Sequence, residues 1–326
     1  MNSFKNDIVI VVPLYNEEKT LYPLVERLKA IIKTASFSIQ VVLVNDGSTD
    51  LTREMIEDIC GNDTNFKGIF LSRNYGHQIA VSAGLKYSNP GKGVLIIDGD
   101  LQDPPELIHD FYDLLCKGND VVYAVRKNRK ESLLKRICYK LYYRLQRRIS
   151  NFEIPIDSGD FSMLSTRVVN LMNEMPEQDR YLRGIRAWVG FKQIGFEYER
   201  QERFAGNSKY TWGKLIQLAF KGIFNFSDFP IRFITRLGLM TICISLLYFG
   251  YNLYRKLMYN DIPQGFTATI LAIILFSGVQ LISLGIIGEY VLRIYNQVKQ
   301  RPLFIVDKTI NLEDFGKDTA DRNTNN

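Results

Sequence analysis

The stretch Gly93–Asp100 reads GVLIIDGD, an apolar run that ends in two aspartates separated by one glycine. Similar apolar runs recur in the first 125 residues, and amphipathic stretches separate them. On one face of the first amphipathic stretch lie Leu21, Leu24, Val25, Leu28 and Ile32. Apolar strands that alternate with helices predict an α/β fold with a parallel sheet covered on both faces. The predicted strands are Ile8–Val12, Val41–Asn45, Gly68–Ser72, Gly93–Asp98 and Asp120–Val125.

Polar residues follow these strands directly. Ligands of such sheets bind outside the carboxyl ends of the strands, so the sequence predicts a binding site there. Ser48, Thr49 and Asp50 are candidate caps for the helix that follows the second strand. The polar segments are PLYNEE (Pro13–Glu18), NDGSTD (Asn45–Asp50), SRNYGHQ (Ser72–Gln78) and DGDLQDPPE (Asp98–Glu106).

Composition excludes several classes of protein. A chain of 326 residues with 46% hydrophobic and 23% charged residues is neither disordered nor of low complexity. Its net charge of +6 suits an anionic partner, whether nucleic acid, lipid or a phosphorylated substrate. Four scattered cysteines and two histidines exclude a Cys/His zinc site. The absence of G-x-G-x-x-G and Walker A motifs argues against nicotinamide, flavin and ATP-hydrolysing functions.

Two long stretches without charge lie near the C-terminus. Leu237–Tyr254 has 18 such residues and Ile262–Gly288 has 27. As a helix the shorter stretch covers about 27 Å, close to the ~30 Å of bilayer hydrocarbon. A pair of buried core helices is the alternative, but two adjacent runs with a short polar connection favour a transmembrane hairpin. The expected spans are residues 235–255 and 265–288.

The hairpin divides the chain into a catalytic domain over residues 1–230, the hairpin over 231–292 and a tail over 293–326. Basic residues before and after the hairpin slightly outnumber those in its loop, which is a weak positive-inside bias. The cysteine-bearing N-terminal part shows no export signal. We therefore expect an integral protein of the bacterial inner (plasma) membrane, with the catalytic domain and both termini cytoplasmic.

Residues 133–150 form a basic amphipathic stretch. A surface helix docked on the sheet is the alternative, but in a membrane-anchored chain the pattern favours a helix on the anionic leaflet. Residues 212–230 are predicted to be a second interfacial element. The apolar positions of the first stretch recur every four residues: Leu133, Ile137, Leu141, Leu145 and Ile149. Its cations are Lys135, Arg136, Lys140, Arg144, Arg147 and Arg148.

The residues after two of the strands indicate metal and nucleotide chemistry. Asp98 and Asp100, with Gln102 as a neutral oxygen donor, can hold Mg²⁺ or Mn²⁺ together with substrate phosphates. An isolated D-x-D is more often a turn, but its place at the end of a strand favours a metal site. Asp46 can accept hydrogen bonds from a base or ribose, and Gly47 permits a close backbone approach. The alternative for this segment is a plain strand-to-helix turn.

Taken in order, four motifs resemble glycosyltransferase family 2 on a GT-A fold: VVPLYNEE, LVNDGSTD, SRNYGHQIAVSAGL and DGDLQDPPE. The later motifs resemble its membrane-anchored polyprenyl-phosphate glycosyltransferases: DSGDFSML, RGIRAWVGF, ERFAGNSKY, FSDFPIR and GEYVLRIYNQVKQRPLFIV. The resemblance reaches to about Val306. It implies a GT-A-type mostly parallel sheet, and an inverting transfer of one sugar from a nucleotide donor to a polyprenyl phosphate with Mg²⁺ or Mn²⁺. It also implies a homo-oligomer such as a tetramer.

The resemblance also implies roles for single residues. The nucleotide sugar would be bound by Pro13, Tyr15, Glu17, Asp46, Asp98 and Gly99. The metal would be held by Asp98, Asp100 and Gln102. Phosphates of donor or acceptor would face Arg126, Arg203 and Lys209. The catalytic residues would be Asp100, Asp160 and Arg203.

Two further residues need a choice between roles. The acceptor phosphate is largely ionised at neutral pH and needs little deprotonation. We therefore interpret Asp160 as a positioning group or weak base rather than an obligatory base. His77 is interpreted as a donor-pocket or structural residue, because the reaction offers it no evident proton to move.

Other functions and donors remain open from the sequence. A processive polysaccharide synthase would need more helices and a Q-x-x-R-W motif, where this chain has QDRYLRGIRAW. An inactive membrane scaffold is disfavoured by the intact aspartates, and nucleic-acid binding lacks a recognisable module. UDP-glucose is the expected donor, with GDP-mannose and UDP-amino-arabinose as alternatives.

Overall fold

The computed structural model describes residues 6–127, 158–199, 229–259 and 265–312. The chain divides into two compact units. The first holds the N-terminal part of the chain and the residues from Arg301 onward, and the second holds residues 213–300 with a short piece before them. Each unit is described by itself. The sequence-predicted interfacial stretch 133–150 and most of the stretch 212–230 lie outside the described residues.

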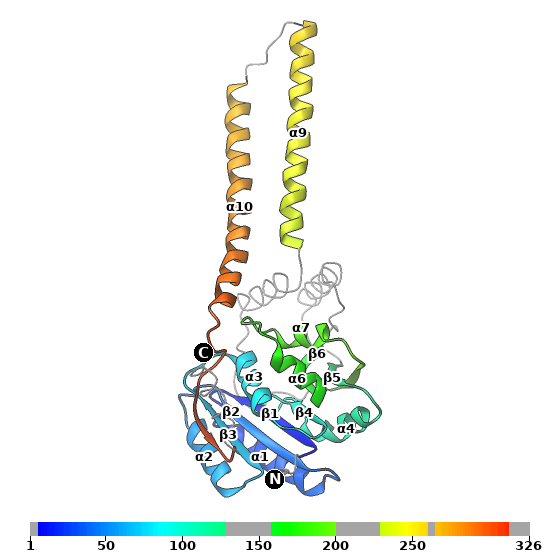
Figure 1. Cartoon of the computed structure of the whole chain (residues 1–326), viewed down its shortest axis with the longest axis vertical. Coiled ribbons are helices and arrows are strands. Elements are labelled where there is room, and N and C mark those ends of the chain that lie inside the picture. Colours follow the sequence, from blue (N-terminus) through cyan, green and yellow to red (C-terminus); the bar gives the residue numbers. More distant parts are fainter. Residues whose placement is uncertain (1–5, 128–157, 200–228, 260–264, 313–326) are drawn as a thin grey trace, which may run out of the picture. The chain divides into compact units, whose positions relative to one another are not determined.

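The first unit is built on an eight-stranded sheet with the order β7-β5-β6-β4-β1-β2-β3-β8 (Figure 1). The central strands β4, β1, β2 and β3 run parallel, as does β7 beside β5. Strand β6 runs antiparallel between β4 and β5, and β8 runs antiparallel beside β3. The strands are β1 Ile8–Leu14, β2 Ile39–Asn45, β3 Phe66–Leu71, β4 Gly93–Ile96, β5 Val121–Arg126, β6 Ser158–Ser165, β7 Gln193–Tyr198 and β8 Val306–Ile310.

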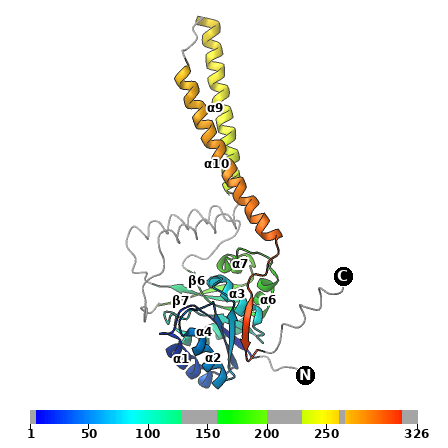
Figure 2. The same ribbon diagram turned by 90° about the vertical axis from the view of Figure 1, so that its left-hand side faces the viewer.

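Helices cover both faces of this sheet, as the apolar strands predicted. Successive side chains of a strand point to opposite faces. Ile8 and Ile10 of β1 join the core cluster with α1, α2 and α4, whereas Val11 meets α3 on the other face. In Figure 2 the strands lie between these two groups of helices. The helices are α1 Leu21–Thr34, α2 Thr52–Asn62, α3 His77–Tyr87, η1 Pro105–Leu107, α4 Ile108–Cys116, α6 Thr166–Glu174 and α7 Leu182–Trp188.

Helix α3 packs unusually close to β1. A Cβ atom added at Gly84 would lie 2.2 Å from Cγ1 of Val11, so only glycine fits in this part of the helix. The loss of helix propensity at a glycine is offset here by the close approach of the helix to the sheet. This packing fixes the first residues of α3, which carry part of the candidate site.

One detail of the predicted elements is wrong. Helix α2 begins at Thr52, so Ser48, Thr49 and Asp50 are not its N-cap; the cap position is Leu51, without a side-chain hydrogen bond. Asp50 instead accepts a hydrogen bond from the backbone N–H of Thr52 within the turn. On α1 the predicted apolar face packs on the core: its first four residues are buried with Ile31, and the half-buried Ile32 packs against the same cluster.

The second unit consists of two long helices, α9 (Phe229–Tyr259) and α10 (Phe266–Val298). Their apolar segments Phe233–Met258 and Leu275–Val298 are each long enough to cross a membrane. None of the described side chains in these segments is buried inside the protein. The two helices lie side by side (Figure 1), as a hairpin would require.

Candidate active site

The site is assembled at the carboxyl edge of the parallel strands. The segments that follow β1, β2 and β4 carry Tyr15, Asp46 and Asp98, as predicted. Strand β6 starts at this same edge because it runs antiparallel to β4. Its register pairs Ile96 with Ser162, and continuing that register by two residues sets Asp160 opposite Asp98. The topology thus joins two carboxylates that are far apart in sequence.

The PLYNEE and NDGSTD segments form one hydrogen-bonded unit. Asn16 has a left-handed backbone (φ 55°), and its N–H donates to Oγ of Ser48 at 3.1 Å. Its Oδ1 accepts from the backbone N–H of Thr49 at 2.8 Å. These bonds fix the segment in which Pro13 is buried and Tyr15 is 39% exposed. Tyr15 is therefore presented to solvent by a rigid turn.

The same unit also ties down Glu17. Its backbone N–H donates to Oγ1 of Thr52 at 2.9 Å, and its carboxylate accepts from the hydroxyl of Thr20 at 2.9 Å. Glu18 donates its N–H to Asp50. The first turns of α1 and α2 are thereby linked through the predicted nucleoside-binding residues.

Asp46 lies inside the protein with only 2% of its surface exposed. Its two carboxylate oxygens accept backbone N–H groups from Tyr75 at 2.7 Å and Gly76 at 2.9 Å. Burial raises the pKa of Asp46, although these two hydrogen bonds act in the opposite direction. Gly47 has a φ of +64°, and a Cβ there would lie 2.4 Å from the backbone of Arg73. Asp46 and Gly47 therefore hold the segment after β3 against the end of β2.

Asp98 and Asp100 lie in the turn after β4. The Asp100 side chain accepts from the backbone N–H of Gln102 at 3.2 Å, and the residue is 8% exposed. The Asp98 side chain is 28% exposed. Burial raises the pKa of Asp98; the nearby His77 lowers it. Gly99 packs so closely that a Cβ there would lie 2.5 Å from the side chain of Leu14.

These residues fit a divalent cation that is shared with a substrate. Oδ1 of Asp98 is enclosed and makes no hydrogen bond in the described part of the chain, where its contact is with Nε2 of His77 at 3.5 Å. The described residues contain no group of three or more His, Cys, Asp or Glu side chains placed to hold a metal. Mg²⁺ is typically bound by one or two carboxylates, with water and phosphate oxygens completing its shell. Gln102 is half-buried next to this pair, so its place is compatible with the predicted ligand role.

Asp160 is held by three side chains. Arg183 forms a bidentate ion pair with it, with Nε–Oδ1 and Nη2–Oδ2 distances of 2.8 and 3.0 Å. Gln78 donates to Oδ2 at 3.2 Å, and Nε2 of His77 lies 3.4 Å from the same oxygen. Burial alone would raise the pKa of Asp160, but Arg183 and His77 hold it well below its usual range. This carboxylate is ionised and weakly basic.

His77 bridges the two aspartates that the register brings together. Its Nε2 lies 3.5 Å from Oδ1 of Asp98 and 3.4 Å from Oδ2 of Asp160. Burial would lower the pKa of His77, but the charges of Asp98 and Asp160 raise it to about 9. The imidazole is thus positively charged at neutral pH and acts as a fixed counter-charge between the carboxylates.

Arg126, at the end of β5, belongs to a neighbouring polar cluster. Tyr198 at the end of β7 hydrogen-bonds both Arg126 and Asp103. Burial alone would lower the pKa of Arg126. Electrostatic interactions with Tyr198 and Asp103 outweigh this effect, so the pKa of Arg126 is raised. The other two predicted phosphate-binding residues, Arg203 and Lys209, lie outside the described residues.

Sequence reasoning missed Gln78, Arg183 and Arg186. Both arginines belong to the RGIR segment of α7, where a spacing of three residues places them on one helix face. Arg186 is 3% exposed, and burial lowers its pKa to about 10. Its Nη1 donates to the carbonyl of Gly159, directly before Asp160, at 3.4 Å. Basic residues at helical spacing in an otherwise apolar helix were the available signal.

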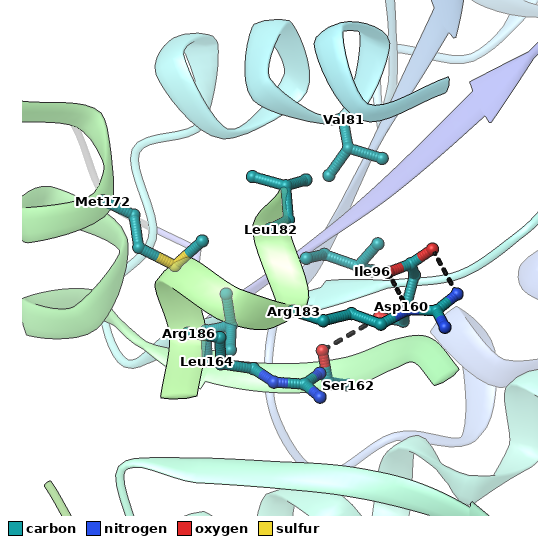
Figure 3. Close-up of a pocket in the computed structure, with 9 residues that line it drawn as sticks. All are labelled: Val81, Ile96, Asp160, Ser162, Leu164, Met172, Leu182, Arg183 and Arg186. Carbon is teal, nitrogen blue, oxygen red and sulfur yellow. Dashed lines mark hydrogen bonds and ion pairs between the residues drawn. The ribbon is translucent and has the colours of Figure 1, made fainter. Parts of the chain in front are cut away.

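A small cavity lies behind Asp160, between α3, α7 and β6 (Figure 3). Its volume of about 10 Å³ accommodates one water molecule at most. Asp160, Ser162, Arg183 and Arg186 supply its polar wall, and Ser162 donates its hydroxyl to the Asp160 carbonyl at 2.9 Å. A sugar or phosphate does not fit there, so this cavity is not the substrate-binding pocket.

The aspartate-containing turns and the sheet beneath them define a class of enzyme. The chain belongs to glycosyl transferase family 2, whose profile matches residues 9–171, from β1 into α6. It is therefore a glycosyltransferase, and its mixed α/β sheet is of the GT-A type. The family that the sequence motifs indicated is confirmed.

Individual relatives extend the match beyond that domain. An uncharacterized glycosyltransferase of Synechocystis is 40% identical over 94% of this chain and 96% of its own length. The SfII prophage-derived bactoprenol glucosyl transferase of Shigella flexneri is 36% identical over 93% of this chain and 98% of its own. A crystal structure of glucosyl-3-phosphoglycerate synthase from Mycobacterium tuberculosis with Mn²⁺, UDP-glucose and phosphoglyceric acid has 16% identity and a TM-score of 0.43. That match covers 66% of this chain and 76% of the synthase.

Proposed function

We propose that this glycosyltransferase transfers a single glucose from UDP-glucose, with inversion, to a polyprenyl phosphate of the bactoprenol type at the cytoplasmic membrane face. The supporting observation is the convergence of Asp98, Asp100 and the ion-paired Asp160 at one edge of the sheet. The bactoprenol glucosyl transferase of Shigella flexneri, which matches over nearly the whole chain, supports the acceptor class.

Each part of the site has a role in this reaction. A divalent cation bound to Asp98, Asp100 and Gln102 would neutralise the departing nucleoside diphosphate. Pro13, Tyr15, Glu17, Asp46 and Gly99 belong to the turns proposed to bind the nucleotide sugar. Arg126, with Arg203 and Lys209, would face phosphates, because arginines reduce the repulsion between two anionic groups.

Asp160 is proposed to position the reactants. Its pKa lies well below the usual range, so it is a poor proton acceptor at neutral pH. The acceptor phosphate already carries most of its negative charge there, because its second pKa is about 6. The reaction therefore calls for fixed charges rather than a strong base.

The proposal places the enzyme in a bacterial inner membrane. Helices α9 and α10 would span the bilayer, and both termini would be cytoplasmic. The basic residues of 133–150 would contact an anionic lipid surface. A homo-oligomer, such as a tetramer, completes the proposal.

The donor and acceptor are tested with the purified enzyme in detergent. It is given short-chain polyprenyl phosphate and either UDP-glucose, GDP-mannose or UDP-amino-arabinose, and mass spectrometry identifies the lipid product. We expect a hexosyl polyprenyl phosphate with UDP-glucose alone. Product with another donor would replace the proposed sugar, and no lipid product with any of the three would contradict the acceptor.

The metal is tested with Asp100→Ala. We expect transfer to fall by several orders of magnitude, because the loss of leaving-group stabilisation costs several kcal/mol. Asp110→Ala, at an exposed position of α4, is the matched control and should be fully active. Normal turnover of Asp100→Ala in the presence of a chelator would refute the metal assignment.

A further inference from the structure

Gln78 connects two parts of the candidate site through a single amide group. Its Nε2 donates to Oδ2 of Asp160 at 3.2 Å. Its Oε1 accepts the backbone N–H of Leu182 at 2.9 Å. The two partners lie 82 and 104 residues further along the chain, so the contacts exist only in the folded enzyme.

The second contact stabilises the start of α7. Leu182 is the first residue of that helix, and the cap residue Tyr181 makes no side-chain capping bond. The first N–H groups of a helix need acceptors from outside it. Gln78 supplies one of them from α3.

The next residue of α7 completes a closed ring of contacts. Arg183 forms the bidentate ion pair with Asp160, whose Oδ2 also accepts from Gln78. The ring therefore runs from Gln78 to Asp160, to Arg183, and through the backbone of Leu182 back to Gln78. Displacement of the Gln78 amide would remove a hydrogen bond from Asp160 and another from the start of α7, the helix that carries Arg183.

We propose that Gln78 is a positioning residue for transfer, which sets the orientation of Asp160 and places Arg183 against it. This inference rests on the proposed function, in which Asp160 lies at the reacting centre. An amide suits the position because it carries a donor and an acceptor in one uncharged group. A carboxylate there would instead set two negative charges about 3 Å apart. The cations around Asp160 are His77, Arg183 and Arg186. Asp98 is the further anion beside it.

The diagnostic variant is Gln78→Glu, assayed from pH 5 to 8 as the ratio of its transfer rate to that of the wild type. The introduced carboxylate repels Asp160 when ionised, whereas its protonated form again offers one donor and one acceptor. At pH 8 we expect Gln78→Glu to transfer sugar about 10- to 100-fold more slowly than the wild type. This is the loss that accompanies one broken charge-assisted hydrogen bond. The ratio should rise as the pH falls.

Gln78→Met separates positioning from titration. Methionine has a similar length and forms no comparable hydrogen bond, so its rate should be low at every pH, with a flat ratio. The matched control is Gln40→Glu. Gln40 lies at the amino end of β2, whereas the site lies at the carboxyl ends of the strands, so this variant should behave as the wild type. UDP affinity should be unchanged in all three variants, because the side-chain hydrogen bonds of Gln78 in the described structure go to Asp160 and Leu182.

The outcomes separate this inference from the proposed function. If the wild type makes no lipid product, the proposed function fails. If the wild type is active and either Gln78 variant matches its rate at every pH, Gln78 has no positioning role. An equal loss of UDP affinity and transfer would show a general structural defect and would also overturn the inference. Where Gln78→Glu does not fold, a low Gln78→Met rate with retained UDP affinity still supports the inference.

Discussion

Asp46 and Gly47 illustrate how single residues shape the site. Both oxygens of Asp46 are used by backbone N–H groups of Tyr75 and Gly76, within the protein itself. Such charge-assisted bonds to a buried carboxylate are stronger than neutral ones. Asp46 therefore organises the segment that leads into α3 and His77, and any contact with the nucleoside would add to that structural task.

We predict that Gly47→Ala impairs this segment. Its φ of +64° disfavours a side chain by about 1–2 kcal/mol. The new Cβ would also lie 2.4 Å from backbone atoms of Arg73, which cannot move aside cheaply. We expect a lower unfolding temperature and weaker UDP binding, measured by fluorescence and calorimetry in detergent.

A matched glycine provides the control. Gly61 lies in α2, and a Cβ there meets nothing within 4 Å. Gly61→Ala should therefore leave UDP affinity intact and stabilise the helix by up to about 1 kcal/mol. Equal behaviour of the two variants would show that the contact of Gly47 with the segment after β3 has no importance.

The residues of the site differ in how far the sequence could place them. Asp46, Asp98 and Asp100 each follow a parallel strand, so a common edge could be predicted from the strand pattern alone. The contacts of Gln78 with Asp160 and Leu182 could not be predicted from the sequence. They depend on the antiparallel insertion of β6 between β4 and β5, and no local pattern reports which strands become neighbours.

Strand β8 is the element that sequence analysis missed most clearly. Residues 306–310 were assigned to a tail after the hairpin, yet they pair antiparallel with β3 at the edge of the sheet. A strand of only five residues, two of them charged, carries a weak signal, whereas β1 has an unbroken apolar run. Arg53 with Asp307 and Lys308 with Glu57 form ion pairs across this edge.

We predict that Asn311 holds β8 in place. Its Nδ2 donates to the carbonyls of Cys60 at 2.6 Å and Phe66 at 3.0 Å. Because the residue has a φ of 59°, Asn311→Gly removes both bonds without adding backbone strain. The expected loss in unfolding free energy is about 1–3 kcal/mol, read from denaturant unfolding in detergent.

Asn311→Asp extends that test. It keeps the size of the side chain but replaces the donor with a carboxylate that faces two carbonyl oxygens, so the loss should exceed that of Asn311→Gly. If neither variant changes the stability, the hydrogen bonds of Asn311 do not anchor the strand.

The junction of β5 with α6 should give the catalytic unit part of its acid sensitivity. Nε of Arg167 donates to Asp120 at 2.6 Å, and this contact, with that of Ser165, holds the pKa of Asp120 below its ordinary value of 3.8. A carboxyl group whose pKa is lowered by folding stabilises the fold above its unfolded pKa. That stabilisation is lost as the pH falls through the lower, folded value.

The corresponding variant is Asp120→Asn. We expect a lower unfolding temperature than the wild type at pH 7, with a difference that narrows steadily below about pH 4. Thermal unfolding followed by circular dichroism between pH 7 and 3 measures it. A difference that stays constant over this range would mean that the ion pair of Asp120 with Arg167 contributes nothing to acid sensitivity.

At the scale of the whole molecule, the two long apolar helices near the C-terminus were the most readily predicted part. Length and absence of charge can be read directly from the sequence, and they are the two properties that a bilayer requires of a spanning helix. The helices are longer than the expected spans of 235–255 and 265–288, since α9 has 31 residues and α10 has 33. Charged residues lie within the C-terminal parts of both helices: α9 continues past Arg255 to Tyr259, and α10 continues past Arg293 to Val298.

The orientation of the hairpin yields the last prediction. Two spans return the chain to the side from which it entered, so the catalytic unit and the segment between α9 and α10 should lie on opposite sides of the membrane.

Cys116 is exposed on α4 and reports on the catalytic unit, while Cys60 is buried. In a background without Cys138 and Cys243, Ile262→Cys adds a reporter between the two helices. A membrane-impermeant maleimide should label Cys116 only in inverted vesicles and position 262 only in intact spheroplasts. Labelling of both from one side would exclude a spanning hairpin, and the reverse pattern would place the catalytic unit outside the cytoplasm.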